Sequence, residues 1–584
     1  MQARRLLASA AAAATIATVS GVAAGVAGFA GAAQAATGVA SAPSRWVVLA
    51  DTGASADAIA ANLRATGATV TSVNGEVGLV TATSTDSGFR ATAGRISGVQ
   101  GVAADISIGS APHRVSPSVV EREHAQSGGS GKHGGAQPAK PLADPLDNLL
   151  WGMQMINAPK AHATERGDRR VTVGVLDTGI QADHPDLAAN VDRSKSRNFT
   201  TDIPEIDGPC ETASCVDPAT VDDGGHGTHV AGTIAASLNG FGLSGVAPGV
   251  SLVNIRGGQD AGYFFLGPVV NALTYAGDIG LDVVNMSFYV DPWLYNCTGG
   301  APEDSPAAVA DQKVIIESVN RALKYANRKG VTLVGSLGNE HDNVSAPRPD
   351  ASSPDYDNPA NDWDTAPYLR TIDNKTCVDL PLEGPNVLGV SALGPSGRKA
   401  DYSNHATDLK GNEIELSAPG GWFRDGFGTA TYRTNENLIL STYPLAVLQE
   451  EGSVDAAGNV TPDGEALGVI KQCTTKPIKG AAACGYYAYL QGTSMAAPHA
   501  SGVAALAVSA HGHSDGSRGY TLAPATVKRI LSSTATDHAC PAGGVQAYTQ
   551  EGRDATFTAT CVGTTAFNGF YGAGIVNAAG VVKH

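Results

Sequence analysis

Apolar residues between positions 171 and 392 gather in short, nearly continuous runs that are separated by longer mixed segments. Five such runs span 171–177, 251–255, 281–286, 331–336 and 386–392. Runs of this length and density are typical of parallel strands that are buried on both faces. Helical stretches lie between several of them, notably 311–328, which ends before Gly330. The pattern therefore predicts an α/β fold with a doubly wound, mostly parallel sheet.

A different pattern precedes this region. It consists of a β-rich run at 45–50, an amphipathic segment at 56–67, a hairpin-like stretch at 70–83, a helical segment at 87–98 and a last strand at 99–108. The pair Asn74-Gly75 favours a tight turn inside the hairpin. The order strand, helix, strand, strand, helix, strand predicts a small ferredoxin-like α+β domain. Glycine, proline and serine then dominate 127–145, which is the composition of a linker.

The N-terminal residues have the pattern of an export signal. Residues 1–5 include two arginines, a long Ala/Val/Gly segment follows from Leu6, and Ala33-Gln34-Ala35 offers a cleavage site. A signal anchor is the alternative because the apolar segment is long, but its small residues and the cleavage site favour removal. No other stretch is apolar enough to span a bilayer. We therefore expect residues 1–35 to be a signal peptide, and the mature protein to be secreted, extracellular and free of the membrane.

Composition limits the partners of the chain. The 584 residues carry a formal net charge of −16 and contain no basic run, so nucleic-acid binding is not expected. Eight cysteines in an exported chain predict disulfides. A zinc site that uses Cys210 and Cys215 with His226 and His229 is the alternative, but its spacers are shorter than those of zinc fingers. Proximity in the sequence alone suggests the pairs Cys210–Cys215, Cys473–Cys484, Cys540–Cys561 and Cys297–Cys377.

Three polar residues lie at or just beyond the ends of strand-like runs, where such a sheet gathers its reactive groups: Asp177, Asn339 and Ser494. Asp177 ends the run 171–177, His226 opens the helical stretch "HGTHVAGT", and Ser494 opens the small-residue stretch "SMAAPHASG". A serine at a helix start lies beside unpaired amide groups that can stabilise an oxyanion. Pro498 predicts a kink one turn later unless the surroundings hold the helix. Asp, His and Ser in this chain order form one of the known catalytic triads.

These blocks resemble the subtilisin family of secreted serine proteases. "DTGI", "HGTHVAGT" and "GTSMAAPH" occur in the family's order, joined by "GVAPGVSL", "VVNMS", "GSLGNE" and a terminal "YGAGIVNAA". The resemblance covers about 151–579. It implies that Ser494 is the nucleophile, His226 the general base and Asp177 the group that orients the imidazole. It also implies that Asn339 and the Ser494 backbone N–H stabilise the oxyanion, and that His229 is a packed or hydrogen-bonded helix residue.

The resemblance implies that substrate binds in extended form between two strand edges. These edges are Ser287-Phe288-Tyr289 and Ser336-Leu337-Gly338, which also wall the main specificity pocket. Tyr289 replaces an expected glycine and Leu337 replaces a smaller residue. The side chain that this pocket accepts is therefore not implied by the family.

The family also implies a structural calcium ion, with no cofactor for catalysis. Its ligands would come mainly from the loop "SLNGFGLSG" at 237–245 and would be oxygen atoms, which suit calcium. A glycine-rich loop without an ion is the alternative. The expected ligands are the side chains of Asp147, Asp186 and Asn239 and the backbone carbonyls of Ser237, Phe241 and Leu243.

We therefore expect a monomeric serine endopeptidase that acts on polypeptides and is made as a zymogen. Residues 36–110 resemble the family's propeptide, which acts as inhibitor and folding template; 111–145 would be the linker and 146–584 the subtilisin-like catalytic domain. Segments 340–385 and 445–483 exceed the family core. The first is rich in Asp, Asn and Pro, which predicts a solvated loop, with a metal site or a lid as alternatives. The alternative functions are a dedicated processing protease for one partner protein or leader peptide, and a non-catalytic binding module.

Overall fold

The computed structural model describes residues 44–105, 144–204, 206–350, 369–411, 413–476, 478–514, 516 and 519–584. The chain divides into two units, 1–43 and 44–584. The predicted signal peptide and nearly all of the predicted linker lie outside the described residues. Among the residues described, no helix combines the length and the apolar character that crossing a membrane requires.

A seven-stranded parallel sheet forms the centre of residues 144–584, in the order β15-β14-β10-β8-β5-β7-β6. All five predicted runs are strands of this sheet, so the predicted doubly wound α/β fold is confirmed. The strands are β5 (Thr172–Leu176), β6 (Arg197–Asn198), β7 (Ser251–Arg256), β8 (Val283–Met286), β10 (Thr332–Ser336), β14 (Val387–Leu393) and β15 (Leu416–Pro419).

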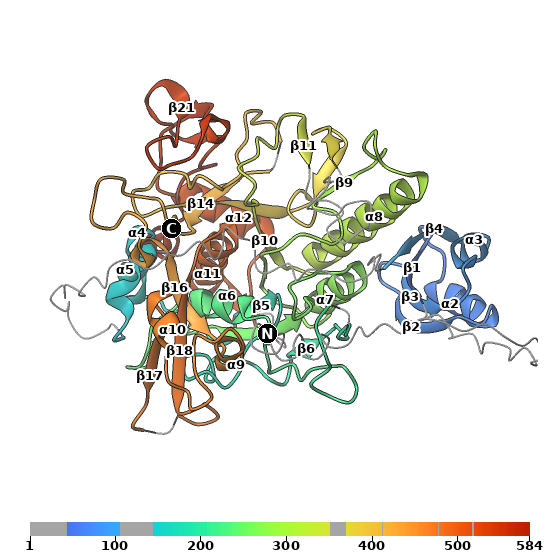
Figure 1. Ribbon diagram of the computed structural model, residues 1–584, viewed down its shortest axis with the longest axis horizontal. Helices are drawn as coiled ribbons and strands as arrows, with labels where there is room; N and C mark the ends of the chain where they lie inside the picture. The colour runs from blue at the N-terminus through green and yellow to red at the C-terminus, as the bar shows by residue number, and fades with distance from the viewer. Residues whose placement is uncertain are drawn as a thin grey trace, which may run out of the picture. The chain divides into compact units, whose positions relative to one another are not determined.

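Helices cover both faces of the sheet. α6 (His226–Ala235) and α11 (Thr493–His511) pack on one face, and α7 (Leu266–Asp278) and α8 (Pro306–Arg328) lie side by side on the other (Figure 1). Successive strand residues alternate between the two cores: Val283 joins the core under α6 and α11, whereas Val284 joins the core under α7 and α8. This two-residue alternation explains why the strands read as continuous apolar runs.

Helix α11 is buried along almost its whole length, from Thr493 to Ser509. Small residues permit this burial, since a Cβ atom added to Gly502 would lie 2.5 Å from the Cβ atom of Val246. The helix continues through Pro498 to His511. The surrounding core therefore holds the helix at the position where the sequence predicted a kink.

Residues 44–105 form the predicted strand and helix order, with antiparallel strands arranged β2-β3-β1-β4. Ser55 caps α2 by accepting the Ala58 N–H at 3.2 Å. A turn follows Asn74, as its Asn-Gly pair predicted. The elements are β1 (Ser44–Ala50), α2 (Ala56–Ala65), β2 (Thr69–Asn74), β3 (Leu79–Ser84), α3 (Phe89–Gly94) and β4 (Val99–Ala104).

The segment 340–385 differs from the predicted solvated loop where it is described; its residues 351–368 lie outside the described residues. Strand β12 (Arg370–Ile372) pairs with β11 (Arg348–Asp350), and β13 (Cys377–Asp379) pairs with β9 (Tyr295–Cys297). Arg370 is fully buried and Asp379 is 4% exposed. Ion pairs with Asp304 and Asp350 allow the Arg370 side chain to be buried, a possibility that composition alone did not reveal.

The segment 445–483 is also structured. It contains α9 (Leu445–Glu450), α10 (Pro462–Ala466) and β17 (Ile470–Cys473), and β17 joins β18 (Cys484–Leu490) and β16 (Ile439–Tyr443) in an antiparallel sheet. All four disulfides suggested by sequence proximity are present: Cys210–Cys215, Cys297–Cys377, Cys473–Cys484 and Cys540–Cys561.

The other elements are short. They are α4 (Trp151–Met155), α5 (Ala158–His162), α12 (Pro524–Thr534), α13 (Ala578–Lys583), β19 (His513–Ser514), β20 (Tyr520–Thr521), β21 (Val545–Gln546), β22 (Ala559–Thr560), β23 (Gly563–Thr564), β24 (Phe567–Asn568) and four single-turn 3-10 helices at η1 (Asp147–Leu149), η2 (Asn435–Asn437), η3 (Ala542–Gly544) and η4 (Ala555–Phe557).

Candidate active site

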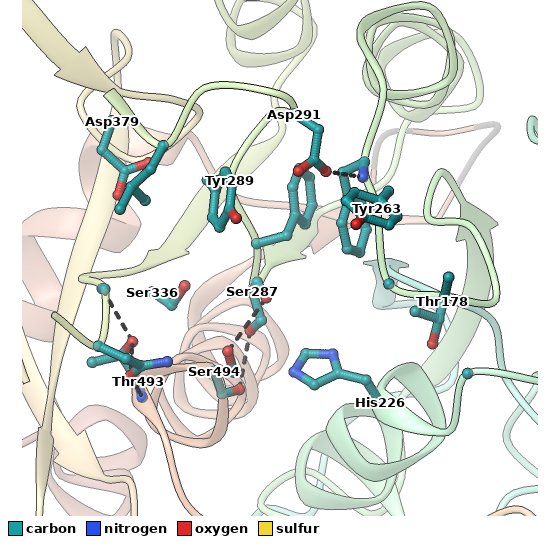
Figure 2. Close-up of a pocket in the computed structure, with 18 of the residues that line it drawn as sticks. Thr178, His226, Tyr263, Ser287, Tyr289, Asp291, Ser336, Asp379, Thr493 and Ser494 are labelled. Atoms are coloured by element: carbon teal, nitrogen blue, oxygen red, sulfur yellow. Dashed lines mark hydrogen bonds between the residues drawn. The ribbon is translucent and has the colours of Figure 1, made fainter. Parts of the chain in front are cut away.

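The four predicted catalytic residues lie at one edge of the parallel sheet. Asp177 follows β5 and Asn339 lies shortly after β10, at the carboxyl ends of the strands. His226 and Ser494 lie in the first turns of α6 and α11. Figure 2 shows the imidazole of His226 directed toward Ser494 across the pocket that both residues line.

Asp177 and His226 form a direct contact. The His226 Nδ1 atom lies 2.7 Å from Asp177 Oδ1, which also accepts the Thr178 N–H at 2.8 Å. The Asp177 side chain is fully buried, and that of His226 is 11% exposed. Because a carboxylate only accepts hydrogen bonds, Nδ1 carries the proton here. The other ring nitrogen, Nε2, is then the atom that can accept a proton.

Local chemistry fixes the start of α6. The Asp222 carboxylate accepts the N–H groups of Gly225 and Thr228, both at 2.8 Å, and so satisfies donors that a helix N-terminus leaves unpaired. A Cβ atom on Gly227 would lie 2.2 Å from the Gly179 carbonyl oxygen. The glycines around His226 therefore let the helix approach the segment that follows Asp177.

Ser494 is held against the end of β8. Its hydroxyl donates to the Ser287 carbonyl at 3.3 Å, and the Ser287 hydroxyl donates to the Ser494 carbonyl at 3.0 Å. Ser494 is 5% exposed. Its backbone N–H belongs to the first turn of α11 and has no hydrogen-bond partner within the described parts of the chain. That N–H can therefore donate to a group bound beside the hydroxyl.

The side-chain amide of Asn339 has one end occupied and one end available. Its Oδ1 atom accepts both the backbone N–H and the hydroxyl of Thr493, each at 2.9 Å. Thr493 in turn accepts the Gly338 N–H at 3.1 Å. Nδ2 makes no hydrogen bond to the described residues, and Asn339 lines the pocket. Two donors, Asn339 Nδ2 and the Ser494 N–H, can thus serve one oxyanion.

The pocket has a volume of about 170 Å³ and includes most of the predicted substrate edges. Leu337 differs, because its side chain is fully buried in a cluster with Val344 and Leu382. Successive side chains of an extended segment point in opposite directions, so Leu337 faces away from the pocket between two neighbours that line it. The predicted edge residues that do line the pocket are Ser287, Phe288, Tyr289, Ser336 and Gly338.

Two groups of lining residues were missed in the sequence. Phe264 stacks on Phe288 with ring centroids 4.0 Å apart and forms an aromatic wall. Four carboxylates also line the pocket, namely those of Asp260, Asp291, Glu340 and Asp379. The Cys297–Cys377 pair was the available signal for Asp379, since it predicts that the segments around both cysteines lie together.

His229 has the role expected of it. Its Nε2 atom lies 3.0 Å from the Ile439 carbonyl oxygen, and the side chain is fully buried in α6. Burial lowers the pKa of His229 to about 3, so the imidazole is neutral at neutral pH. His229 therefore packs in the core and His226 faces the pocket.

The predicted calcium ligands surround Asp186. Its Oδ2 atom accepts the Leu243 N–H at 3.0 Å and the Tyr487 hydroxyl at 2.8 Å, and its backbone carbonyl accepts the Ser237 N–H at 2.8 Å. Asn239 Nδ2 lies 3.5 Å from Asp186 Oδ1. Burial raises the pKa of Asp186 well above its usual range.

Two more carboxylates lie at this loop. Asp144 accepts the N–H groups of Asn239 and Gly240, and Asp147 accepts the N–H and the hydroxyl of Ser244. The loop is closed further by the Phe241 N–H, which donates to Asn239 Oδ1 at 2.9 Å. Burial raises the pKa of Asp144 to about 6. Among the described residues, neither carboxylate nor that of Asp186 forms an ion pair with lysine or arginine.

A separate group of carboxylates gathers near β7, with oxygen atoms within 4.8 Å of one another: Asp202, Glu211, Asp217 and Asp260. The buried side chain of Arg256 forms ion pairs with Asp217, at 2.9 Å, and with Asp260. The Arg256 guanidinium therefore already supplies a positive charge to this group of carboxylates.

Comparison with known proteins gives consistent matches. Residues 168–574 match the model of the Subtilase family. Subtilisin DY of Bacillus licheniformis is 26% identical over 387 residues, which cover 66% of this chain and 91% of the relative. The major intracellular serine protease of Bacillus subtilis (strain 168) is 34% identical over 199 residues, which cover 34% of this chain and 51% of the relative.

Two solved structures share the fold. The epidermin leader peptide processing serine protease from Staphylococcus aureus superposes with a TM-score of 0.57 at 18% identity, over 93% of this chain and 98% of that chain. Fervidolysin from Fervidobacterium pennivorans, a keratinolytic enzyme related to subtilisin, gives a TM-score of 0.51 at 21% identity, over 93% of this chain and 61% of that chain.

Proposed function

This chain belongs to the subtilase family of serine peptidases, and we propose that it is an endopeptidase whose reaction is carried out by Asp177, His226 and Ser494. The observation that carries the proposal is the 2.7 Å contact of His226 Nδ1 with Asp177 in the pocket that Ser494 lines. Nucleophilic acyl transfer requires this arrangement of the His226 imidazole, in which the buried Asp177 carboxylate contacts Nδ1 and the Ser494 hydroxyl lies on the side of Nε2.

The reaction begins when the Ser494 hydroxyl leaves Ser287 and attacks the carbonyl carbon of the scissile bond. His226 Nε2 takes the hydroxyl proton, and Asp177 stabilises the imidazolium. The carbonyl oxygen becomes an anion that accepts hydrogen bonds from the Ser494 N–H and Asn339 Nδ2. His226 then gives the proton to the leaving amine. Water, activated by the same imidazole, releases the acyl group and restores Ser494.

We further propose that residues 44–105 act as an inhibitory propeptide. This domain contacts α7 and α8: Arg321 donates to the carbonyls of Ala50 at 2.9 Å and Val77 at 3.0 Å. The Asp105 side chain accepts the Gly267 N–H at the start of α7. Because Phe264 of the pocket lies shortly before Gly267, this contact links the last described residue of the domain to the segment that lines the cleft. Export of the precursor is supported by the N-terminal pattern and the four disulfides.

Calcium is proposed as a structural ion at the loop of Asn239. The support is the buried carboxylates of Asp144 and Asp186 and the half-buried carboxylate of Asp147, which share the loop and form no ion pair with lysine or arginine among the described residues. Their oxygen atoms and the loop carbonyls are the ligands that calcium prefers. A bound divalent cation would neutralise this charge and hold the loop between α6 and β7.

The test is hydrolysis of casein and of a mixed peptide library by the mature protein and by the Ser494→Ala variant. We expect internal cleavage of many sequences by the wild-type protein and none by the variant. Equal hydrolysis by both proteins contradicts the proposed role of Ser494. Cleavage of very few library members, with casein left intact, would favour the second candidate function, a processing protease for one partner. The four carboxylates that line the pocket favour this candidate, because they would restrict which substrate side chains bind.

A further inference from the structure

The charge of the active-site pocket is unbalanced. Among its described lining residues, four are carboxylates and none is lysine or arginine. Asp260 forms an ion pair with Arg256, Asp291 accepts the Phe264 N–H and Glu340 accepts the side-chain amide of Asn404. Glu340 and Asp379 lie on the Ser336 side of the cleft, and neither forms an ion pair with lysine or arginine among the described residues.

Asp379 is a buried carboxylate of this pocket. It ends β13, where it pairs with Tyr295 of β9, and it is 4% exposed. Its Oδ1 atom is buried without a hydrogen-bond partner in the described parts of the chain. Figure 2 shows Asp379 beyond Tyr289 and Ser336, on the side of Ser494 away from Thr178. A buried, unpartnered acceptor at the end of a pocket is costly unless a ligand supplies the donor.

The surroundings of Asp379 do not neutralise it. Its own N–H donates to Glu383 at 2.6 Å, which places a second carboxylate beside it. Glu340, directly after Asn339, accepts Asn404 Nδ2 at 2.8 Å. Arg348 interacts electrostatically with Asp379, but its guanidinium is paired with Asp342 at 2.9 Å.

We propose that Asp379, assisted by Glu340, binds the cationic side chain of an arginine or lysine residue whose carbonyl carbon Ser494 attacks. This assignment rests on the proposed function, which makes the pocket beside Ser494 the site of that side chain. An extended substrate that places its carbonyl at Asn339 and the Ser494 N–H directs this side chain past Ser336 toward Asp379. The long aliphatic stem of lysine or arginine can pack on Tyr289, with the charged group at the carboxylate.

Electrostatics supports this assignment. Burial raises the pKa of Asp379 well above its usual range and that of Glu340 to about 7, because each charge lacks water and lies near other carboxylates. A bound ammonium or guanidinium would stabilise the ionised forms. A neutral or acidic substrate side chain would leave Asp379 buried and unpaired, which costs free energy. The pocket therefore selects a cationic side chain both by attracting it and by this cost of binding other side chains.

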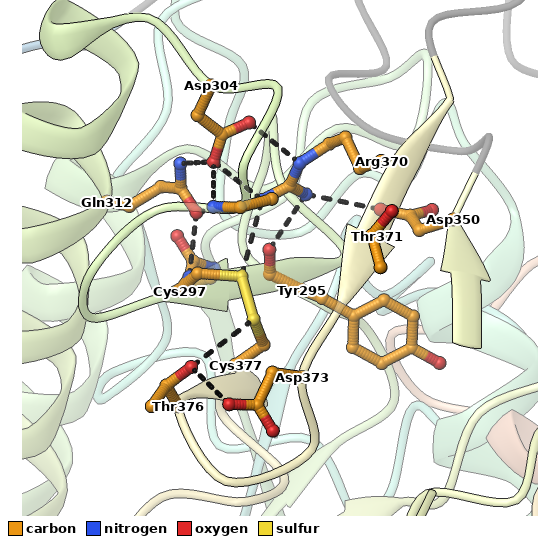
Figure 3. Close-up of a disulfide and its surroundings, with 12 residues drawn as sticks. Tyr295, Cys297, Asp304, Gln312, Asp350, Arg370, Thr371, Asp373, Thr376 and Cys377 are labelled. Atoms are coloured by element: carbon orange, nitrogen blue, oxygen red, sulfur yellow. Dashed lines mark hydrogen bonds and ion pairs between the residues drawn. A yellow bond between two sulfur atoms is a disulfide. The ribbon is translucent and has the colours of Figure 1, made fainter. Parts of the chain in front are cut away.

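The strand pair that carries Asp379 is held rigidly. Strands β9 and β13 are joined by the Cys297–Cys377 disulfide, two residues from Asp379 (Figure 3). Beside the disulfide, the fully buried Arg370 binds Asp304 at 3.0 Å, Gln312 at 2.9 Å and the Tyr295 carbonyl at 3.0 Å. These contacts hold both strands to α8. Because the Asp379 carboxylate is held in a fixed position, it can select a substrate side chain whose charged group reaches that position in the pocket.

The experiment uses tetrapeptide p-nitroanilides that differ only in the last residue: arginine, lysine, citrulline or glutamate. Citrulline has the shape of arginine without its charge. We expect kcat/KM for arginine to exceed that for citrulline by roughly 10- to 100-fold, the range of a charge-assisted hydrogen bond. Asp379→Asn should remove most of this ratio, and Glu340→Gln a smaller part. Asp260→Asn, the matched control on the other side of the cleft, should keep the ratio.

Active sites are counted with a fluorophosphonate, so that each rate refers to folded enzyme. Benzamidine offers a test without a variant: it should inhibit the wild-type protein at least about tenfold more strongly than neutral benzamide. Equal rates for arginine and citrulline, equal inhibition by the two small molecules, or equal loss of the ratio in the Asp260 and Asp379 variants would each overturn the assignment. Failure to cleave any substrate would instead overturn the proposed endopeptidase function.

Discussion

At the scale of single residues, Asn339 shows how a side chain with two chemically different ends can be divided between structure and catalysis. Its carbonyl end is fixed by Thr493, next to the proposed nucleophile, and its amide end faces the pocket. The donor is thus oriented before substrate arrives, which is the condition under which a hydrogen bond stabilises a transition state effectively.

The Asn339→Ala variant should therefore lose kcat while its KM changes little. We expect a loss of roughly 10² to 10³ in kcat, the magnitude measured for the corresponding donor of a related subtilisin rather than derived from this chain. Steady-state kinetics with one p-nitroanilide substrate measures both constants. An unchanged kcat would mean that Asn339 does not contact the oxyanion.

The pH dependence of charge selection is a second prediction at this scale. Burial raises the pKa of Glu340 and of Glu383 to about 7, and it raises the pKa of Asp379 well above its usual value. These groups are protonated and neutral at low pH and become negative as pH rises. A cationic side chain binds the negative form, whereas Arg348 is positive throughout.

The ratio of kcat/KM for the arginine and citrulline substrates should therefore rise between pH 5.5 and 8.5, by about an order of magnitude if one carboxyl dominates. Taking the ratio cancels the pH dependence of the catalytic step, which is common to both substrates. A ratio that is constant or that falls with pH would show that these carboxyls do not recognise the charge.

At the scale of elements, the pairing of β9 with β13 links a disulfide to specificity. Cys297 and Cys377 are 80 residues apart in the chain. Replacing both with serine should lower the free energy of unfolding by about 2–4 kcal/mol, because the unfolded chain regains the entropy of that loop. It should also reduce the ratio of kcat/KM for the arginine and citrulline substrates, since the strand that carries Asp379 is then held less rigidly.

The matched control replaces Cys210 and Cys215, which are only 5 residues apart, and should destabilise less. Urea unfolding under non-reducing conditions measures both effects. If the control pair costs as much stability and selectivity as the Cys297–Cys377 pair, the disulfide does not act through Asp379.

The loop that contains Asn239 gives the other prediction at this scale. If calcium neutralises Asp144, Asp147 and Asp186, a chelator should lower the melting temperature, and added calcium should restore it. Calcium at 100 times its Kd would contribute about 2.7 kcal/mol to the free energy of unfolding. Magnesium is the control, because it requires a smaller octahedral site. A thermal transition that EGTA leaves unchanged contradicts the proposed ion.

At the scale of the whole molecule, the parallel sheet and its helices could be predicted from the sequence because burial on both faces forces continuous apolar runs. The positions of Asp177, His226 and Ser494 followed from the same argument, since strand ends and helix starts meet at one edge of such a sheet. Asp379 could not be found in this way. Its place in the pocket depends on the pairing of β9 with β13, which involves residues far apart in the chain.

Composition was misleading for the same segment. Arg370 and Asp379 lie in the segment that composition predicted to be solvated, yet both are buried. Arg370 is buried because Asp304 and Gln312 bind it, and Asp379 is buried because β13 pairs with β9. The sequence also failed to predict that the Leu337 side chain points into the core and away from the pocket. Side chains alternate between the two sides of an extended segment, and the sequence does not reveal at which residue this segment starts. Patterns in the sequence thus predicted the positions of the proposed catalytic groups better than the residues that line the pocket.

Processing of the precursor is the prediction that involves the whole chain. If the enzyme removes residues 44–105 itself, the Ser494→Ala variant should accumulate as the longer form, and the wild-type protein should be cut between 105 and 144. Expression in a host that lacks related proteases, followed by mass spectrometry, measures this. Normal maturation of the variant there would contradict self-processing.

The most direct test of the central claim is covalent labelling of the mature protein with a fluorophosphonate, followed by mass spectrometry of its peptides. A fluorophosphonate reacts fastest with a serine whose hydroxyl proton is taken up by an adjacent base. The account predicts one modified residue, Ser494, and little labelling in the His226→Ala variant. Labelling of another serine, or equal labelling without His226, would contradict it.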